Sequence, residues 1–291
     1  MLSPEIQRKI RKLKIVTKGL MEGPLAGDVV SAHRGYGVEF HQIREYQFGD
    51  DVRFIDWKSS SRLNRMFVKE CLEERNRRMI LAIDISGSSF YGSAMVRFEK
   101  IKEIATILAF AAHYAKDSIG LLFFADDVDR IIEPKNTEAH LHFLLQQLHE
   151  YQPKFNRNTN LSSVLDYVAE KWYKDAIVFV ISDFIDEQFE KSLRAASLRV
   201  DLVAVRCYDP IERMLPSVGF LQVEDVESGQ TLYIESSEQS SAARLLKSRM
   251  MQQNKMFLHV GIDVVDVSYH YDSCAQLVEF FKKRMFHMSM K

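Results

Sequence analysis

Short apolar runs alternate with segments of helical periodicity from residue 79 to the end of the chain. Runs rich in β-branched and aromatic residues predict strands. They lie at 79–85, 118–125, 176–182, 201–208 and near 258–268, with an edge strand near 130–134. Between them, apolar residues recur every three or four positions, which predicts helices. These lie at 98–115, 137–151, 161–173, 187–198, about 239–256 and from about 273. Such alternation favours an α/β fold, a mostly parallel sheet with helices on both faces.

The pattern divides the chain into three predicted parts. Residues 1–78 hold 6 of the 12 glycines in a dense mixture of aromatic and charged residues, so we expect a small β-rich N-terminal subdomain after a first helix near 8–14. Residues 79–210 form the expected α/β core. Pro210 and Pro216 flank the start of residues 211–291, a hairpin pattern follows at 218–236, and we expect this hairpin, a strand and helices to pack on the core.

Composition narrows the class of protein. Hydrophobic residues make up 46% and charged residues 27% of the chain, as in ordinary globular proteins. Residues 1–78 carry 16 Lys and Arg against 11 Asp and Glu, but no basic run is dense enough to predict nucleic-acid binding. Three dispersed cysteines suggest a reducing compartment, and no apolar segment approaches the length of a membrane span. We therefore expect a soluble cytoplasmic protein.

Polar side chains with oxygen ligands follow several of the predicted strands. In an open α/β sheet, sites form where the carboxyl ends of neighbouring strands meet. The strand at 79–85 continues as DISGSS, a polar loop precedes the helix at 161, and the strand at 176–182 ends at an aspartate. The candidate metal ligands are Asp84, Ser86, Ser88, Thr159 and Asp183. Carboxylate and hydroxyl oxygens suit a hard divalent cation such as Mg²⁺, although the same residues could instead end strands and cap helices.

This DxSxS sequence with a distant Thr and a distant Asp resembles the metal-ion-dependent adhesion site of von Willebrand factor A domains. The resemblance covers roughly residues 79–210, and all five positions match. It implies a von Willebrand factor A-like sheet and a bound Mg²⁺ whose sixth position is filled by a carboxylate from a protein partner. The chain differs from the family where Arg157 and Asn158 precede the threonine and where Phe184 follows the last aspartate.

An enzyme built on the same residues would lack catalytic groups that it needs. A phosphotransferase with Asp84 as nucleophile would need an acid where Ser86 stands, and a serine hydrolase would need Gly in place of Asp84. No P-loop or HExxH sequence occurs. The acidic stretch at 126–129 lacks the Gly and Glu of a calcium loop, and we interpret it as a solvated turn. We therefore expect a binding protein, with a metal-dependent hydrolase using the same carboxylates as the alternative.

Residues 44–70 interleave acids, bases and aromatic residues. Such interleaving predicts a partly buried network of ion pairs, which favours a scaffold over a docking face. We expect its continuation into residue 79 to be extended. The order Y-x-x-G-D-D-x-R-x-I-D-W-x-x-S-x-R resembles the bacterial family called domain of unknown function 58. The matching residues are Tyr46, Gly49, Asp50, Asp51, Arg53, Ile55, Asp56, Trp57, Ser60 and Arg62.

That resemblance extends over most of the chain. Members of the family carry a von Willebrand factor A-like domain and are often encoded beside MoxR-type AAA+ ATPases. The resemblance implies an adaptor or co-chaperone whose metal site captures a carboxylate of such an ATPase or of its client.

Overall fold

The computed structural model of the chain describes residues 34–47, 50–72, 77–87, 94–152, 157–171, 176–186, 188–208, 219–224, 231–235, 241–268 and 271–289. The chain forms two compact units. The small unit is Leu20–Asn76, and the large unit is Met1–Gly19 with Arg77–Lys291. The first helix predicted near residues 8–14 lies outside the described residues.

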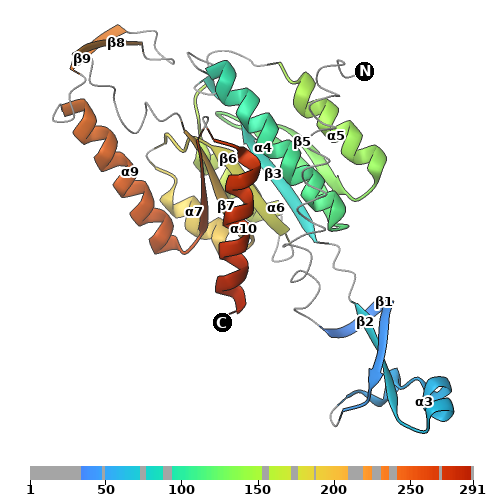
Figure 1. Ribbon diagram of the computed structural model, residues 1–291. Helices are drawn as coiled ribbons and strands as arrows, with labels where there is room; N and C mark the ends of the chain where they lie inside the picture. The colour runs from blue at the N-terminus through green and yellow to red at the C-terminus, as the bar shows by residue number, and fades with distance from the viewer. Residues whose placement is uncertain are drawn as a thin grey trace. The chain divides into compact units, whose positions relative to one another are not determined.

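A six-stranded sheet forms the centre of the large unit (Figure 1). Its strands are β3 (Arg78–Asp84), β4 (Ser118–Phe124), β5 (Val128–Lys135), β6 (Ala176–Ser182), β7 (Asp201–Tyr208) and β10 (Asp263–Ser268). They lie in the order β10-β7-β6-β3-β4-β5, and all neighbours are parallel except the antiparallel edge pair of β4 and β5. The prediction of a mostly parallel sheet is confirmed.

The order of the strands determines where a site can form. The chain runs from β3 to β4 and β5 on one side and then returns to β6 on the other side of β3. At such a reversal the connecting loops diverge and leave a crevice beyond the carboxyl ends of the two central strands. The sequence places Asp84 at the end of β3 and Ser182 at the end of β6, so both lie at this crevice.

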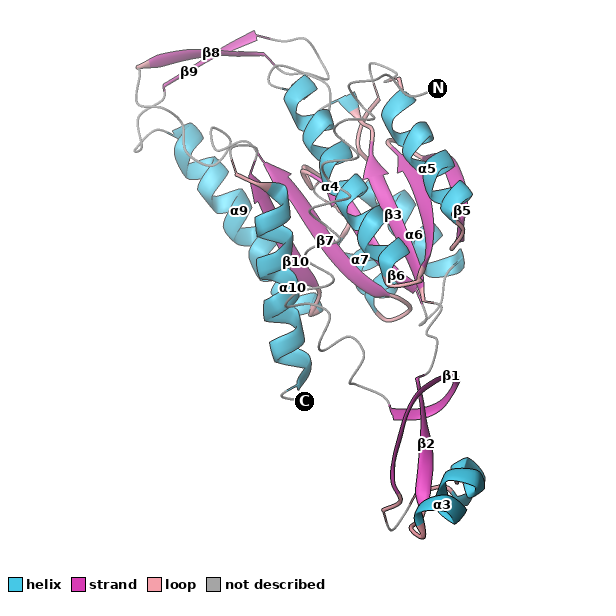
Figure 2. Ribbon diagram, turned by 45° about the vertical axis from the view of Figure 1, so that its right-hand side comes forward, coloured by secondary structure: helices cyan, strands magenta, loops and turns pink. Residues whose placement is uncertain are grey.

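Helices cover both faces of this sheet (Figure 2). They are α4 (Ala94–Tyr114), α5 (Glu138–Glu150), α6 (Leu161–Lys171), α7 (Glu190–Ser197), α9 (Ser241–Val260) and α10 (Ser273–Ser289). Helix α4 contacts α5 and α10, whereas α7 contacts α6 and α9. The two groups therefore form separate layers.

The central strands are buried on both faces, which explains their continuous apolar sequences. Successive side chains of a strand point to opposite faces. Thus Ile80 and Ala82 of β3 belong to the cluster of buried residues that includes α6, α7 and Phe257 of α9. Phe123 of β4 stacks on Tyr151 beyond α5, with ring centroids 4.6 Å apart, on the other layer.

The C-terminal region supplies one strand of the main sheet and a separate pair of strands. Strands β8 (Phe220–Glu224) and β9 (Thr231–Glu235) form the antiparallel pair expected there. Strand β10 pairs with β7 and so extends the main sheet beyond the predicted core boundary at residue 210. The strand predicted near 258–268 is wrong at its start, because residues 258–260 continue helix α9. That helix ends at Gly261, whose φ of 80° suits glycine.

The small unit contains an antiparallel pair, β1 (Arg34–Glu45) and β2 (Phe67–Leu72), with a short 3₁₀ helix η1 (Val52–Phe54) and helix α3 (Trp57–Leu63) between them. The extended conformation expected after residue 67 is confirmed as far as Leu72. Helix α3 was not predicted, although Asp56 caps it by accepting hydrogen bonds from the backbone N–H groups of Lys58 and Ser59.

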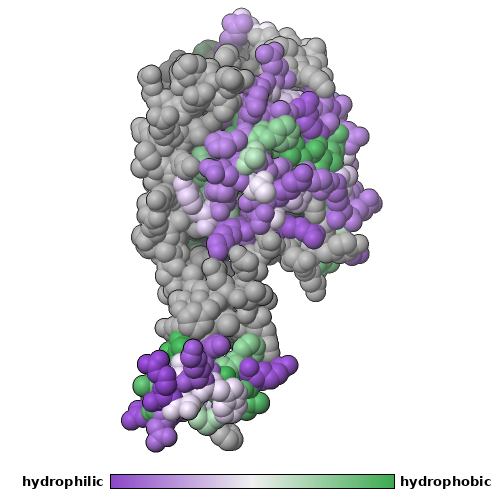
Figure 3. Space-filling model, turned by 90° about the vertical axis from the view of Figure 1, so that its right-hand side faces the viewer, coloured by the Kyte–Doolittle hydropathy of each residue, from purple (hydrophilic) through white to green (hydrophobic). Residues whose placement is uncertain are grey.

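Among the coloured residues seen from the side of α5 and β5, hydrophilic ones predominate, with a smaller gathering of apolar residues (Figure 3). Phe143 of α5 is half exposed. Within the described part of the chain, no helix combines the length and apolar character needed to cross a membrane.

Candidate functional site

Asp84 ends β3 at the crevice and is completely buried. Its Oδ2 accepts a hydrogen bond of 2.6 Å from the hydroxyl of Ser182, and its Oδ1 accepts one of 2.9 Å from the backbone N–H of Ser86. Ser182 and Ser86 are also completely buried. The carboxylate is therefore fixed in orientation by the two central strands, and Ser182 is a site residue that the sequence reading missed.

Asp183 follows β6 and lies at the same edge of the sheet. Its Oδ2 accepts a hydrogen bond of 2.6 Å from Arg97 of α4, and its Oδ1 accepts one of 3.0 Å from the backbone N–H of Ile185. The side chains of Arg97 and Asp183 are 8% and 2% exposed, so this is a buried ion pair. The sequence reading also missed Arg97, because its partner lies 86 residues away in the sequence.

The loop before α6 meets the loop after β3. The backbone N–H of Gly87 donates to the carbonyl of Arg157 at 2.7 Å. Two residues further on, Thr159 is partly buried. The backbone N–H of Asn160 in turn donates to the carbonyl of Ala125, at the end of β4. Two loops of the predicted site are thus joined to each other and to the end of β4 at one edge of the sheet.

The acidic stretch at 126–129 begins as an exposed turn at Asp126 and Asp127, as the sequence indicated, and it is also tied to the loop before α6. Arg157 donates to Asp126 at 2.6 Å and to Asp129 at 2.8 Å. Asp127 accepts a hydrogen bond from the hydroxyl of Ser163 in α6. These bonds hold the loop that carries Thr159 against the end of β4.

A fourth segment, residues 183–189, borders the site. Phe184 has a positive φ of 57°, which glycine adopts more readily. Its ring is buried and packs edge-on against Phe257 of α9, with centroids 5.3 Å apart. Gln253 of α9 donates to the carbonyl of Phe184 at 2.8 Å. Aromatic packing and this hydrogen bond therefore support the backbone conformation.

Electrostatics distinguish Asp84 from an ordinary aspartate. Burial, together with the negative charge of Asp183, raises the pKa of Asp84 to about 6, and hydrogen bonds from Ser182 and Ser86 oppose this rise. The rise shows that burial and the neighbouring carboxylate outweigh the hydrogen bonds that stabilise the ionised form of Asp84.

The predicted metal ligands meet only in part within the described residues. Asp84, Ser86 and Asp183 lie at the ends of β3 and β6, and Thr159 lies in the loop bonded to Gly87. Ser88 lies outside the described residues. The described residues contain no group of three or more His, Cys, Asp or Glu side chains that could hold a metal ion. An ion here would therefore depend on hydroxyl groups and water in addition to the two carboxylates.

The charged block of the small unit is held by local bonds. Asp50 accepts two hydrogen bonds from Arg44, of 2.7 and 2.8 Å, and these bonds lower the pKa of Asp50 to about 2. Asp51 caps η1 and pairs with Arg53. Trp57 is 68% exposed, and Tyr46 is partly buried, whereas Gly49 lies outside the described residues. The acids of the block therefore serve local structure.

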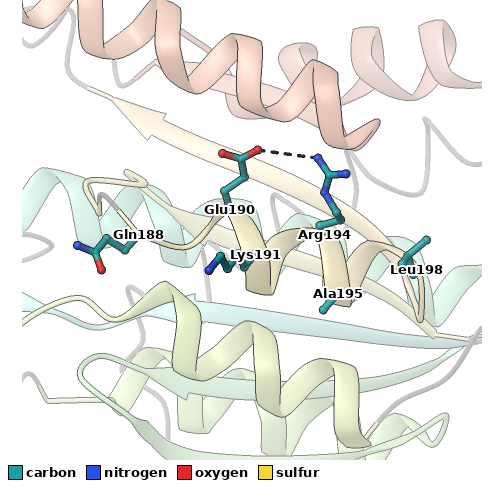
Figure 4. Close-up of a pocket in the computed structure, with 6 residues that line it drawn as sticks. All are labelled: Gln188, Glu190, Lys191, Arg194, Ala195 and Leu198. Carbon is teal, nitrogen blue, oxygen red and sulfur yellow. Dashed lines mark ion pairs between the residues drawn. The ribbon is translucent and has the colours of Figure 1, made fainter.

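Two pockets lie near the segment after β6. One, of about 460 Å³, lies between this segment and α9. The other, of about 850 Å³, lies along α7, where Glu190 and Arg194 are 3.9 Å apart (Figure 4). Its described lining residues are Gln188, Glu190, Lys191, Arg194, Ala195 and Leu198. The described lining of neither pocket includes a predicted metal ligand.

Sequence comparison places the chain in a family. The model described as "Protein of unknown function DUF58" matches residues 42–255, more than half of the chain, so the chain belongs to this family. An uncharacterized protein of Mycobacterium bovis, Mb1516, is 24% identical over 286 residues, which cover 97% of this chain and 90% of that protein. The uncharacterized protein Rv1480 of Mycobacterium tuberculosis gives the same identity and coverage.

Among solved structures, the chain is similar to a conserved hypothetical protein, BatB, from Bacteroides thetaiotaomicron. The TM-score is 0.48 and the identity 16%, over 72% of this chain and 99% of that one. An aerotolerance-related membrane protein from Bacteroides fragilis gives a TM-score of 0.49 and 14% identity, with the same coverage.

Proposed function

We propose that this protein is a metal-dependent protein-interaction module with a von Willebrand factor A-like core. The supporting observation is the junction of three loops at the reversal of strand order. Ser182 of β6 bonds to Asp84 of β3, and Gly87 bonds to the loop that carries Thr159. The proposed ligands, directly or through water, are Asp84, Ser86, Ser88, Thr159 and Asp183.

The chemistry of the described residues fits a divalent cation. Their side chains offer only oxygen donors, which Mg²⁺ prefers. The group contains two buried carboxylates, of which Asp183 pairs with the buried guanidinium of Arg97, so these three side chains together carry net negative charge when both carboxylates are ionised. A bound Mg²⁺ would supply an open coordination position for the carboxylate of another protein.

The residues of this chain prepare the site in defined ways. Ser182 and the backbone N–H of Ser86 orient the carboxylate of Asp84. The backbone N–H of Ile185 and the guanidinium of Arg97 orient Asp183. These donors limit the rearrangement needed when an ion binds, which favours affinity.

We further propose that the partner is a MoxR-type AAA+ ATPase or one of its clients, and that the protein acts in the cytoplasm as an adaptor or co-chaperone. Membership of the DUF58 family supports this proposal through the gene neighbourhood that is typical of the family. The site would recognise an Asp or Glu side chain presented on the partner's surface.

The test combines metal binding with capture of a purified MoxR-type ATPase from the same genome. We expect wild-type protein to bind Mg²⁺ in titration calorimetry and to retain the ATPase in Mg²⁺ but not in EDTA. Asp84→Asn, which preserves side-chain volume, should lose both properties. Asp166→Asn, at an exposed position of α6, is the matched control and should behave as wild type. Equal retention by Asp84→Asn and wild type in Mg²⁺ would contradict the proposal.

The alternative, a metal-dependent hydrolase, would use the same two carboxylates to hold an ion. Both carboxylate oxygens of Asp84 accept hydrogen bonds and the residue is completely buried, so Asp84 would hold the ion and would not itself attack a substrate. No observation on the described residues favours turnover over binding. We therefore do not propose a second function. Turnover of p-nitrophenyl phosphate or acetate that disappears in Asp84→Asn would favour the hydrolase instead.

A further inference from the structure

Arg97 brings a permanent positive charge into the candidate site. It projects from α4, and its Nη1 lies 2.6 Å from Oδ2 of Asp183. Both side chains are almost completely buried. Arginine stays protonated under all physiological conditions, so this charge cannot be removed by a change of pH.

The hydrogen-bond donors at the two carboxylates differ in charge. Asp84 accepts from the backbone N–H of Ser86 and the hydroxyl of Ser182, whereas Asp183 accepts from the backbone N–H of Ile185 and from Arg97. Of these four donors, Arg97 alone carries a charge. It therefore offsets one of the two negative charges, which would otherwise repel each other in a buried environment.

We propose that Arg97 acts as an internal counter-cation, an inference that rests on the proposed metal-binding function. Arg97 stabilises the two strand ends in the absence of an ion and lowers the affinity of the site for Mg²⁺ through repulsion of like charges. With both carboxylates ionised, the site carries a charge of −1, and a divalent ion changes this to +1. An anionic side chain of a partner then restores neutrality, so Arg97 makes the ion-loaded site specific for a carboxylate.

A counter-cation role and a purely structural role for Arg97 predict opposite changes in Mg²⁺ affinity when Arg97 is replaced. If Arg97 only positioned Asp183, its loss would misplace a proposed ligand and weaken Mg²⁺ binding. If it is a counter-cation, its loss removes one positive charge from beside the two carboxylates, which should then bind Mg²⁺ more tightly. Stability without metal should fall in both cases, because a buried ion pair is broken.

The experiment measures Mg²⁺ affinity by titration calorimetry, and thermal unfolding in EDTA and in excess MgCl₂. Arg97→Gln should lower the unfolding temperature in EDTA, bind Mg²⁺ about tenfold more tightly than wild type, and show a larger rise of unfolding temperature with MgCl₂. Arg97→Lys retains the positive charge and should keep the wild-type affinity within about twofold, since the charge decides the effect. Arg194→Gln, on exposed α7, is the matched control and should leave both measurements unchanged.

The outcomes separate this inference from the proposed function. Mg²⁺ binding by wild type with equal or weaker binding by Arg97→Gln overturns the counter-cation role and leaves the metal site standing. Where Arg97→Gln does not fold, a tenfold loss of affinity in Arg97→Lys overturns it as well. The absence of Mg²⁺ binding in wild type and all three variants overturns the proposed function, and this inference with it.

Discussion

The small unit and the large unit place their charged side chains in different settings. In the small unit the ion pairs of the charged block join residues close in the sequence, since Arg44 and Asp50 are six residues apart and Asp51 and Arg53 are two apart, whereas the exposed pair of Arg65 and Glu45 is 20 apart. In the large unit, buried arginines pair with aspartates of distant segments. Arg97 and Asp183 are 86 residues apart, and Arg206 and Asp266 are 60 apart.

Burial explains this difference. Among the described residues of the small unit, Ile55 and Val68 are the hydrophobic residues that are buried, whereas the large unit buries both faces of its central strands. A charge near the surface needs no particular partner, because water solvates it. A charge in the interior must be paired, and the partner comes from whichever element packs there. A buried arginine with a distant partner therefore marks a place where elements far apart in the sequence pack together.

The largest expected effect concerns the core itself. Leu81 of β3 is completely buried, so Leu81→Ala should lower the free energy of unfolding by about 3–5 kcal/mol. Leu63 of α3 in the small unit is 60% exposed, and Leu63→Ala should lower it by less than about 0.5 kcal/mol. Urea unfolding followed by circular dichroism measures both. Similar losses for the two variants would show that the units do not differ in packing as described.

A smaller effect should distinguish the two kinds of ion pair. Arg206 of β7 bonds to Asp266 of β10 and to Gln253 and Asn254 of α9. Because this arginine is buried, Arg206→Gln should lower the free energy of unfolding by about 2–4 kcal/mol. The exposed pair of Arg65 and Glu45 is the comparison, and Arg65→Gln should leave the urea midpoint unchanged. A midpoint shift for Arg65→Gln as large as that for Arg206→Gln would contradict the distinction.

The pH dependence of folding stability should also differ between an aspartate of the large unit and one of the small unit. Burial raises the pKa of Asp117, before β4, from 3.8 to about 6, despite a hydrogen bond from the backbone N–H of Arg77. The folded state therefore holds this proton more tightly than the unfolded state. Stability from this group is fully present below pH 3.8 and is lost as the pH rises through about 6. Asp50 in the small unit behaves oppositely, because its lowered pKa contributes stability that is lost as the pH falls towards 2.

Asp117→Asn tests the sign of this dependence. The variant should match wild type at about pH 4 and exceed it by up to about 3 kcal/mol at pH 7.5, since a shift of two pKa units corresponds to about that free energy. Urea midpoints of both proteins between pH 4 and pH 8 measure the difference. A difference that does not grow with pH would show that Asp117 is not held protonated by burial.

The sequence predicted the candidate site unevenly. Asp84 and Asp183 were recognised because each directly follows an apolar strand, and parallel strands bring their carboxyl ends to one edge. Arg97 and Ser182 were missed. Arg97 belongs to an amphipathic pattern in which an arginine usually faces solvent, and Ser182 stands at the end of an apolar run where a hydroxyl has no distinctive spacing. Neither residue is recognisable without knowing which strands are neighbours.

The sequence by itself determined the local elements of this protein, because alternation between two faces and the helical period are properties of neighbouring residues along the chain. It also determined the local bonds of the charged block, such as the cap that Asp56 provides for α3. Only the tertiary structure decided that β6 lies beside β3 and that α4 directs Arg97 to Asp183. Those contacts depend on the order of strands and the packing of helices, which bring together residues separated by more than 80 positions in the sequence.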